Sequence, residues 1–284
     1  MKVLVLGASG MLGHAMVRVL SENHNLQVFG SIRSDKVKAF FSPHNAENLV
    51  LCNDVTNFNE LSDIFDKVQP NVVINCISLD KALLTKSSPL LMIPIYALLP
   101  HQLAKLCSGI EARLIHISTD GVFSGSRGNY IEDDACDAQD SYGIIKSIGE
   151  VHEPHAITIR TSIIGHELKR KNGLVEWFLS QKAQVQCFDR VIFSGFPTVV
   201  LAQIIRDFVI PNVDLNGVHH IASNPISKRQ LLLLIAEVYD KKIRFITNNK
   251  VVNNRSLNGE RFRIATGYIP PDWQSLVKSM YSNR

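Results

Sequence analysis

The sequence predicts an α/β protein with a doubly wound parallel sheet and a smaller α/β carboxyl-terminal lobe. Unbroken apolar runs, which are typical of buried parallel strands, alternate with segments whose apolar residues recur at the helical period. A glycine-rich turn joins the first of these strands to the first helix. Because crossovers between parallel strands are right-handed, this alternation gives a sheet with helices on both faces.

The elements follow one another in a regular order. We expect strands at residues 3–6, 26–30, 49–52, 71–77, 113–117 and 156–160, and a returning strand at 217–221. We expect helices at residues 14–20, 90–107, 141–150, 173–181, 198–208 and 227–239. Pro94 and Pro100 interrupt the helix at 90–107, so a kink or a late start is expected there.

Composition and charge exclude several classes of protein. The chain of 284 residues is 45% hydrophobic and 20% charged, which fits a folded globular protein and not a disordered one. The net charge of +4 is mild and the basic residues are scattered, so we expect no nucleic-acid partner and no membrane-binding patch. Because no segment has the features of a signal peptide or a membrane span, we expect a cytoplasmic location.

Neither the cysteines nor the acidic residues of the sequence indicate a metal site. The five cysteines form no Cys-x-x-Cys pair and mostly lie in apolar segments, which favours reduced core thiols. They are Cys52, Cys76, Cys107, Cys136 and Cys187. The loop at 125–140 is acidic, but its spacing matches no cation-binding loop, so we expect a solvated surface loop.

The turn after the first strand predicts a dinucleotide site. Its three glycines are spaced three residues apart, and they would let the backbone approach a pyrophosphate at the N-terminus of the following helix. A tight strand-to-helix turn without a ligand is the alternative. The cofactor contacts expected here are Gly7, Ser9, Gly10, Met11, Leu12 and Gly13.

The ends of the second and third strands refine this prediction. Arg33 follows the second strand, and a guanidinium there pairs bidentately with a 2′-phosphate, which favours NADPH over NADH. A solvated surface arginine is the alternative. Asp54, followed by Val55, ends the third strand and could hold the adenine amino group, or it could cap the helix that begins near Asn57.

The chemistry-bearing residues follow the fifth strand. Thr119 and Asp120 lie at its carboxyl end, where open α/β sheets bind ligands. Tyr142 and Lys146 lie one turn apart on one face of the next predicted helix. A phenol is a weak acid at neutral pH, and we expect the lysine ammonium to lower its pKa.

Together these motifs resemble the extended short-chain dehydrogenase/reductase superfamily, and within it the dTDP-4-dehydrorhamnose reductases and related nucleotide-sugar 4-ketoreductases. The matching pieces are residues 7–13, 54, 118–120, 122–123, 142–143, 146, 149–150, 160–162 and 197–198. The resemblance implies an NADP-binding Rossmann domain at 1–160, completed by 198–222. It also implies a substrate-binding lobe made of 161–197 and 223–284.

The resemblance also implies roles for single residues. Tyr142 would protonate the C4 ketone oxygen of a nucleotide-activated 4-keto-6-deoxyhexose, while NADPH, with NADH as the other option, delivers hydride. Lys146 would bind the nicotinamide ribose, and Thr119 would hydrogen-bond the ketone oxygen. Asp120 stands where epimerising relatives have a cysteine, which matches the plain reductases. Cofactor contacts are further implied at Cys76, Ile77, Ser78, Ser118 and Thr161, and substrate contacts at Phe123, Trp177 and Arg255.

Several alternatives stay open at this point. The substrate could be dTDP-4-dehydrorhamnose or a UDP-linked 2-acetamido-2,6-dideoxy-4-hexulose, in surface-polysaccharide or O-antigen synthesis. Arg255 could contact the diphosphate or form a structural salt bridge. A non-catalytic NADP-binding subunit of the methionine adenosyltransferase beta type fits the same residues. A homodimer is compatible with the sequence.

The chain departs from the family pattern after the fourth strand, where Cys76-Ile77-Ser78-Leu79 replaces the usual alanine-rich run, and at two further places. Tyr96 stands where the family usually has an asparagine, and the proline usually found shortly before Tyr142 is absent. The departure at Tyr96 affects local cofactor or water contacts, and neither of these two removes the proton donor.

Overall fold

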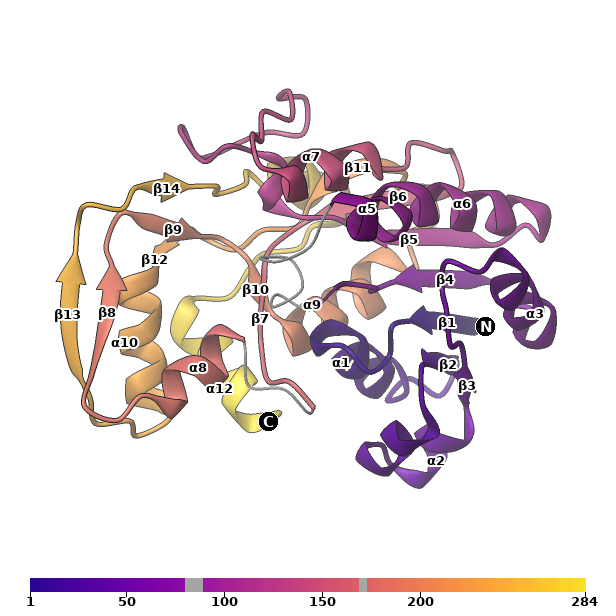
Figure 1. Ribbon diagram of the computed structural model, residues 1–284, viewed down its shortest axis with the longest axis horizontal. Helices are drawn as coiled ribbons and strands as arrows, with labels where there is room; N and C mark the ends of the chain where they lie inside the picture. The colour runs from indigo at the N-terminus through magenta and orange to yellow at the C-terminus, as the bar shows by residue number, and fades with distance from the viewer. Residues whose placement is uncertain (80–88, 169–172) are drawn as a thin grey trace.

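The computed structural model describes residues 1–79, 89–168 and 173–284. Its main feature is a sheet of seven parallel strands in the order β11-β6-β5-β4-β1-β2-β3 (Figure 1). The strands are β1 (Lys2–Leu6), β2 (Gln27–Ile32), β3 (Leu49–Leu51), β4 (Val72–Asn75), β5 (Arg113–Ile117), β6 (Ala156–Arg160) and β11 (Gly217–His220). The strand order reverses between β1 and β4, and such a switch point is where doubly wound sheets bind ligands. The predicted fold class is confirmed.

Helices cover both faces of this sheet, as its alternating side chains require. Val3 and Val5 of β1 share one apolar core with α1 (Met11–Leu20) and α9 (Thr198–Ile204). Leu4 and Leu6 point to the other face and share a second core with α3 (Phe58–Val68) and α6 (Leu99–Gly109). A short α2 (Pro43–Glu47) and a 3₁₀ turn (Asp35–Phe40) lie between β2 and β3.

The helix interrupted by prolines is continuous and contains a π turn. It consists of α5 (Pro89–Met92), a π segment (Ile93–Leu98) and α6. Pro100 has no N–H to donate to the carbonyl of Tyr96, and the amide of Leu99 instead donates to Pro94, five residues back. A widened turn therefore replaces the predicted kink or late start.

The same helix, Pro89–Gly109, is long and apolar enough to cross a membrane by length and composition. Core helices of globular proteins also have these properties. Leu99, Leu103 and Cys107 of its second half are fully buried against the sheet. This packing explains the apolar composition of that half of the helix.

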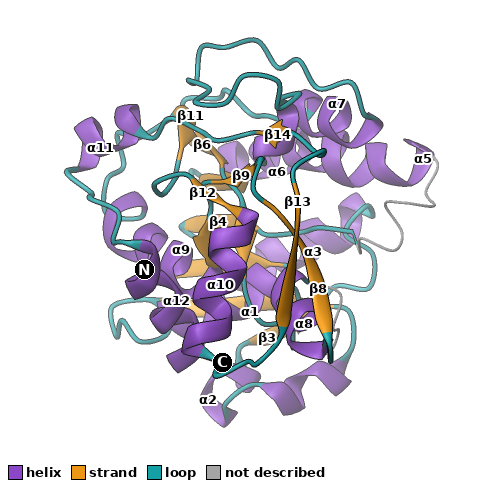
Figure 2. Cartoon of the chain, turned by 90° about the vertical axis from the view of Figure 1, so that its left-hand side faces the viewer, coloured by secondary structure: helices purple, strands orange, loops and turns teal. Residues whose placement is uncertain are grey.

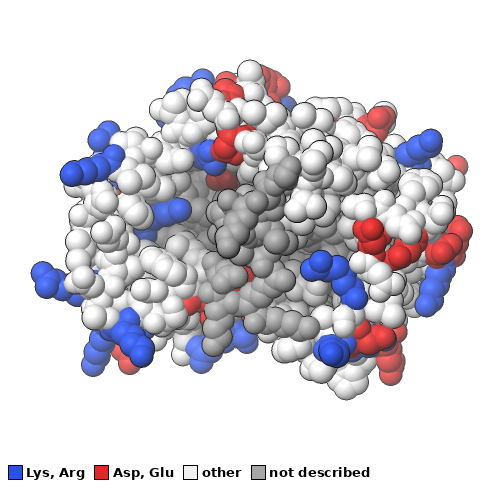
Figure 3. Space-filling view, in the orientation of Figure 1, with Lys and Arg blue, Asp and Glu red and all other residues white. Residues whose placement is uncertain are grey.

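The smaller lobe is built from helices and short strand pairs. Its helices are α8 (Leu174–Ser180), α10 (Lys228–Val238), α11 (Glu260–Thr266) and α12 (Trp273–Ser282). Its strands are β7 (Ile163–Ile164), β8 (Gln184–Phe188), β9 (Val191–Phe193), β10 (Phe196–Pro197), β12 (Ile226–Ser227), β13 (Arg244–Asn248) and β14 (Asn253–Asn254). Figure 2 shows α10 beside the β8–β13 pair, and α12 packs against α10. On the face in Figure 3, acidic and basic side chains are interspersed.

The first turn depends on close backbone packing at Gly13. A Cβ atom there would lie 2.1 Å from the carbonyl oxygen of Gly7. We expect Gly13→Ala to lower the free energy of unfolding by about 1–3 kcal/mol, because backbone would have to shift. Urea unfolding measures this change.

Gly109→Ala is the matched control, since a Cβ atom at this helix end would meet no atom within 4 Å. Its stability should equal or exceed that of the wild type, because alanine favours the helix. A Gly13→Ala protein as stable as this control would contradict the packing argument.

Candidate functional site

The glycine turn leaves the N-terminus of α1 open. Gly7 has a positive φ of 81°, and its amide donates to the Ser31 hydroxyl at 3.0 Å. Gly10 occupies the N-cap position and supplies no side-chain acceptor to the first turn of the helix. Free amides at a helix N-terminus are suited to a phosphate, so the turn fits a pyrophosphate-binding role. Ser9 and Met11 are half-buried on this turn.

Arg33 and Asp54 lie at the ends of neighbouring strands. Arg33 is exposed and has no hydrogen bond or ion pair with any described residue. The Asp54 carboxylate accepts hydrogen bonds from the Thr56 hydroxyl at 2.7 Å and the Thr56 amide at 2.9 Å, and these bonds lower its pKa. The N-cap of α3 is Asn57, so the alternative in which Asp54 caps that helix is wrong. Val55 is half-buried beside it.

The loop after β4 packs against the glycine turn. A Cβ atom on Gly7 would lie 3.2 Å from Cα of Ile77, so the two segments are in close contact. Burial raises the pKa of the neighbouring Cys76 thiol to about 12, which leaves it protonated and unreactive. Ser78 is exposed, and its hydroxyl lies 3.0 Å from that of Tyr96.

The second cluster forms where α7 (Ser141–Ile148) meets the 3₁₀ turn Asp120–Val122. Asp140 caps α7 by accepting a hydrogen bond from the amide of Gly143 at 2.8 Å. A Cβ atom on Gly143 would lie 2.2 Å from the carbonyl oxygen of Gly121, so only glycine lets these segments approach so closely. This approach brings Tyr142 beside Thr119, since a Cβ atom on Gly121 would lie 3.1 Å from Cε1 of Tyr142 and 3.2 Å from Oγ1 of Thr119.

Burial controls the charge state of the tyrosine and the lysine. It raises the pKa of Tyr142, as does the neighbouring Tyr96, while the hydrogen bond with Thr119 opposes the shift. Burial also lowers the pKa of Lys146 to about 8, and its Nζ donates to the carbonyl of Ile117 at 3.0 Å. The expected lowering of the Tyr142 pKa is therefore wrong, since burial has the largest effect on it and raises it. The phenol stays protonated at neutral pH.

Asp120 lies beside this cluster and titrates close to neutral pH. Burial raises the pKa of its carboxyl to about 6, against the opposing effects of Arg255, Thr119, Ser162 and Lys228. Arg255 also forms an ion pair with Asp140 at 3.2 Å, which is the structural salt bridge expected as an alternative to a diphosphate contact. Its Nε is buried with no hydrogen-bond partner among the described residues.

Three predicted contact residues are engaged in structural interactions. The Ser118 hydroxyl donates to Glu150 at 2.8 Å, and the Thr161 hydroxyl donates to the carbonyl of Ile221 at 2.8 Å. Phe123 is fully buried and stacked on Tyr130, which corrects its prediction as a substrate contact. A ring inside the core cannot touch a ligand on the surface. Trp177, in contrast, is 39% exposed on α8.

Sequence reasoning missed a buried ion pair beneath the site. Arg160 donates to both carboxylate oxygens of Glu150, at 2.9 and 2.7 Å, and both side chains are buried. Bidentate geometry and the hydrogen bond from Ser118 satisfy most of the polar atoms, which such a pair needs to persist in a core. An arginine at the end of the apolar strand 156–160 was the available signal.

The acidic loop is organised by its carboxylates, so the prediction of a solvated loop is only partly correct. Glu132 is buried and accepts a hydrogen bond from the amide of His220 at 2.9 Å. Asp137 accepts from the Ser124 hydroxyl at 2.7 Å, and Asp133 pairs with Arg261 at 2.6 Å. Within the described ranges no three metal-ligating side chains come together.

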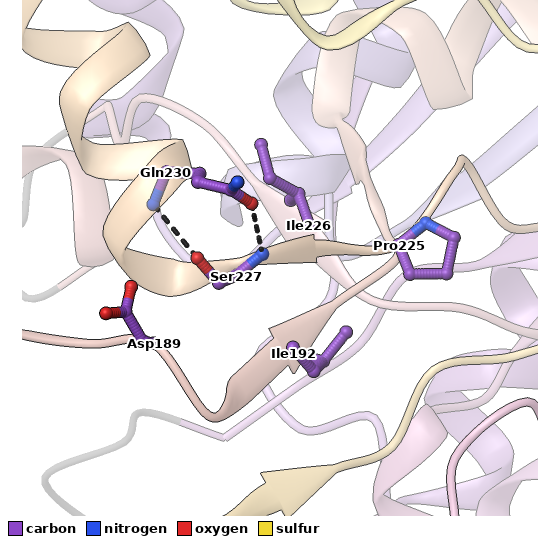
Figure 4. Close-up of a pocket in the computed structure, with 6 residues that line it drawn as sticks. All are labelled: Asp189, Ile192, Pro225, Ile226, Ser227 and Gln230. Carbon is purple, nitrogen blue, oxygen red and sulfur yellow. Dashed lines mark hydrogen bonds between the residues drawn. The ribbon is translucent and has the colours of Figure 1, made fainter. Parts of the chain in front are cut away.

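A pocket of about 340 Å³ lies at the start of α10. It is lined by Asp189, Ile192, Pro225, Ile226, Ser227 and Gln230 (Figure 4). Ser227 and Gln230 form a capping box, with the amide of Gln230 donating to the Ser227 hydroxyl at 3.1 Å. Lys228, which follows Ser227, lowers the pKa of Asp120. This end of α10 therefore lies within electrostatic range of the cluster that contains Thr119 and Tyr142.

Comparison with known proteins reveals relatives along the whole chain. A dTDP-4-dehydrorhamnose reductase of Aggregatibacter actinomycetemcomitans is 25% identical, over 98% of each chain. The methionine adenosyltransferase 2 subunit beta of Bos taurus is 27% identical, over 88% of this chain and 77% of its own. A probable low-salt glycan biosynthesis reductase of Haloferax volcanii is 31% identical over 58% of this chain and 54% of its own.

Solved structures show the same fold. A dTDP-4-dehydrorhamnose reductase from Clostridium acetobutylicum matches all of this chain and 99% of its own with a TM-score of 0.81, at 22% identity. The same enzyme from Bacillus anthracis, solved in complex with NADP, matches 99% of both chains with a TM-score of 0.79, at 20% identity. The family model described as the RmlD substrate binding domain matches residues 1–284, and the chain therefore belongs to this family.

Proposed function

We propose that this protein is an NADPH-dependent reductase of the C4 ketone of a nucleotide-activated 4-keto-6-deoxyhexose. The observation that carries the proposal is the contact between Thr119 and Tyr142, with the buried Lys146 one turn away at the carboxyl edge of the sheet. Nucleotide-sugar reductases among the relatives support the coarser class, an oxidoreductase acting on a sugar nucleotide.

The residues at the switch point fit a dinucleotide cofactor. The open N-terminus of α1 would hold the pyrophosphate, Arg33 the 2′-phosphate and Lys146 the nicotinamide ribose. The adenine would lie toward Asp54, whose second carboxylate oxygen has no described partner. When bound, the cofactor supplies the hydride. One solved relative binds NADP and another structural neighbour binds NAD, so NADH stays a second option.

The remaining chemistry belongs to this chain. Tyr142 gives its proton to the ketone oxygen, and Thr119 hydrogen-bonds the same oxygen as negative charge develops on it. Lys146 is charged at neutral pH, since its pKa of about 8 lies above that pH, and its ammonium would hold the ribose beside the phenol. Asp120 and Arg255 border the same cluster and would orient the sugar.

Finer features of the proposal rest on the relatives or on sequence alone. The dTDP sugar and the UDP-linked 2-acetamido sugar both remain candidate substrates, and a role in surface-polysaccharide or O-antigen synthesis is part of the proposal. The glycan biosynthesis reductase of Haloferax volcanii supports the broader pathway class. The cytoplasmic location, the homodimer, and the domain division at 1–160 with 198–222 stay predictions.

A second candidate function is a regulatory subunit of the methionine adenosyltransferase beta type. It is favoured by the 27% identity that covers most of this chain. The two functions share the fold, and turnover separates them.

The deciding experiment incubates the protein with NADPH and a panel of dTDP-, UDP- and GDP-linked 4-keto-6-deoxy sugars, following absorbance and the sugar product. Reduction of one of these sugars at C4 supports the proposal. Tight NADPH binding without reduction of any sugar, together with a copurifying partner enzyme, would support the regulatory subunit instead.

Removal of the proton donor tests the role of the phenol. We expect Tyr142→Phe to reduce kcat by at least about a hundredfold, because no other group in the cluster can protonate the oxygen as directly. Cofactor affinity, measured by fluorescence titration, should stay close to that of the wild type. Unchanged turnover would refute the assignment.

Cofactor preference tests the role of Arg33. We expect Arg33→Ala to weaken NADPH more than NADH, since only NADPH has the 2′-phosphate. The matched control is Arg244→Ala, which removes an exposed arginine on β13 of the lobe and should affect neither cofactor. Equal weakening of both cofactors by Arg33→Ala would rule out the 2′-phosphate contact.

The pKa of Lys146 predicts the alkaline limb of the pH profile. Burial lowers this pKa to about 8, so the ammonium that binds the cofactor is lost as the pH rises through that value. We expect cofactor affinity and kcat/KM to fall above about pH 8, by up to tenfold per pH unit. In Lys146→Arg the side chain stays charged, and its cofactor affinity should show no such limb. A wild-type profile that is flat to about pH 10 would contradict this prediction.

A further inference from the structure

Tyr96 joins the loop that follows β4 to α7, because its hydroxyl contacts the loop and its ring contacts side chains of the helix. The side chain is buried, with 2% of its surface exposed, on the π turn Ile93–Leu98. The amide of Leu79 donates to the Tyr96 hydroxyl at 2.7 Å. The phenolic proton is then free to be donated to the Ser78 hydroxyl, 3.0 Å away. These two bonds fix the last described residues of the loop that follows β4.

The ring of Tyr96 contacts the catalytic side chains. It packs edge-on against the ring of Tyr142, with centroids 5.5 Å apart and an interplanar angle of 87°. The Nζ atom of Lys146 lies over the same ring, 5.3 Å from its centroid. An ammonium over a phenol ring is attracted by the negative face of the ring, most strongly where water is excluded.

The backbone of Tyr96 secures this arrangement. The Tyr96 carbonyl, to which Pro100 can donate no amide proton, faces the neighbouring helix. Gly149, at the C-cap of α7, packs so closely on it that a Cβ atom would lie 1.8 Å away. The π turn and α7 are therefore held together at both ends of the Tyr142–Lys146 pair.

We propose that Tyr96 is a positioning residue with two separable functions, which deepens the proposed function and rests on it. The hydroxyl holds the Ser78–Leu79 end of the cofactor loop, and the ring keeps Lys146 charged and Tyr142 in place. No other described aromatic ring is recorded in contact with both catalytic side chains.

Two other titratable groups, Glu150 and His116, face Lys146 and affect the charge of its side chain. Glu150, which lies just beyond the C-cap of α7, favours the ammonium, but it is shared with Arg160 and Ser118. His116 of β5 is buried beside it, and burial keeps the pKa of this imidazole well below its usual value, so it stays neutral. The Ile117 carbonyl, which accepts a hydrogen bond from Nζ, favours the ammonium as well, and the Tyr96 ring is a further described group that does so.

Two substitutions separate the functions. Tyr96→Phe removes only the hydroxyl and keeps the ring over Lys146. We expect it to weaken NADPH binding by about threefold to tenfold at every pH, with the midpoint of the alkaline limb unchanged. Tyr96→Leu removes the ring but keeps the site apolar. We expect it to move that midpoint about 0.4–1.5 pH units lower, because the ammonium loses its cation–π partner.

The measurement is a fluorescence titration of NADPH between about pH 6 and 10, which spans the pKa of Lys146 and needs no sugar substrate. NMR of the Lys146 side chain, assigned with Lys146→Arg, follows the same titration in the cofactor-free protein. Tyr268→Phe is the control, since it removes a buried hydroxyl that has no partner among the described residues. It should change neither affinity nor midpoint.

A Tyr96→Leu midpoint equal to or above that of the wild type would overturn the role of the ring. A Tyr96→Phe midpoint that moves as far as that of Tyr96→Leu would overturn the separation of the two functions. Failure of the proposed function looks different, because the wild type would then reduce no sugar, or would bind no NADPH. The Lys146 titration in the cofactor-free variants still decides the inference in both of those cases.

Discussion

The site depends on three places where a glycine receives a backbone carbonyl from a neighbouring segment. Gly13 packs on the carbonyl of Gly7, Gly143 on that of Gly121, and Gly149 on that of Tyr96. The first contact fixes the glycine turn against α1, and the other two fix α7, which carries Tyr142 and Lys146, from both sides. A side chain at any of these three positions would collide with the carbonyl oxygen and force the two segments apart. The geometry of the side chains is thus decided by backbone contacts.

Burial then sets the protonation states within this frame. It favours the neutral form of every group, so it raises the pKa of Tyr142 and of Asp120 and lowers that of Lys146. The result is a protonated phenol beside a lysine that is only moderately basic. In the proposed reaction the phenol loses its proton only when the ketone oxygen becomes negative, and this environment keeps it protonated until then.

The sequence was sufficient for the large sheet and for the Tyr142 helix, because long apolar strands and the helical period are local signals. The sequence was insufficient where a side chain could contact either of two neighbouring groups. Ser118 lies where a cofactor contact is expected, yet its hydroxyl donates a hydrogen bond to Glu150. Phe123 follows the 3₁₀ turn Asp120–Val122, yet its side chain is buried in the core. The short strands of the lobe also gave no signal, since two or three residues carry no periodicity.

The π turn at Ile93–Leu98 has a consequence for the comparison of sequences. A π turn holds more residues than an α turn of equal rise, so the helix faces before and after it are offset in register. A gapless alignment with a relative that has a regular helix therefore pairs residues that occupy different faces. Tyr96 lies on this turn, so its counterpart in such a relative is identified by where the side chain lies in the structure and not by its place in a gapless alignment.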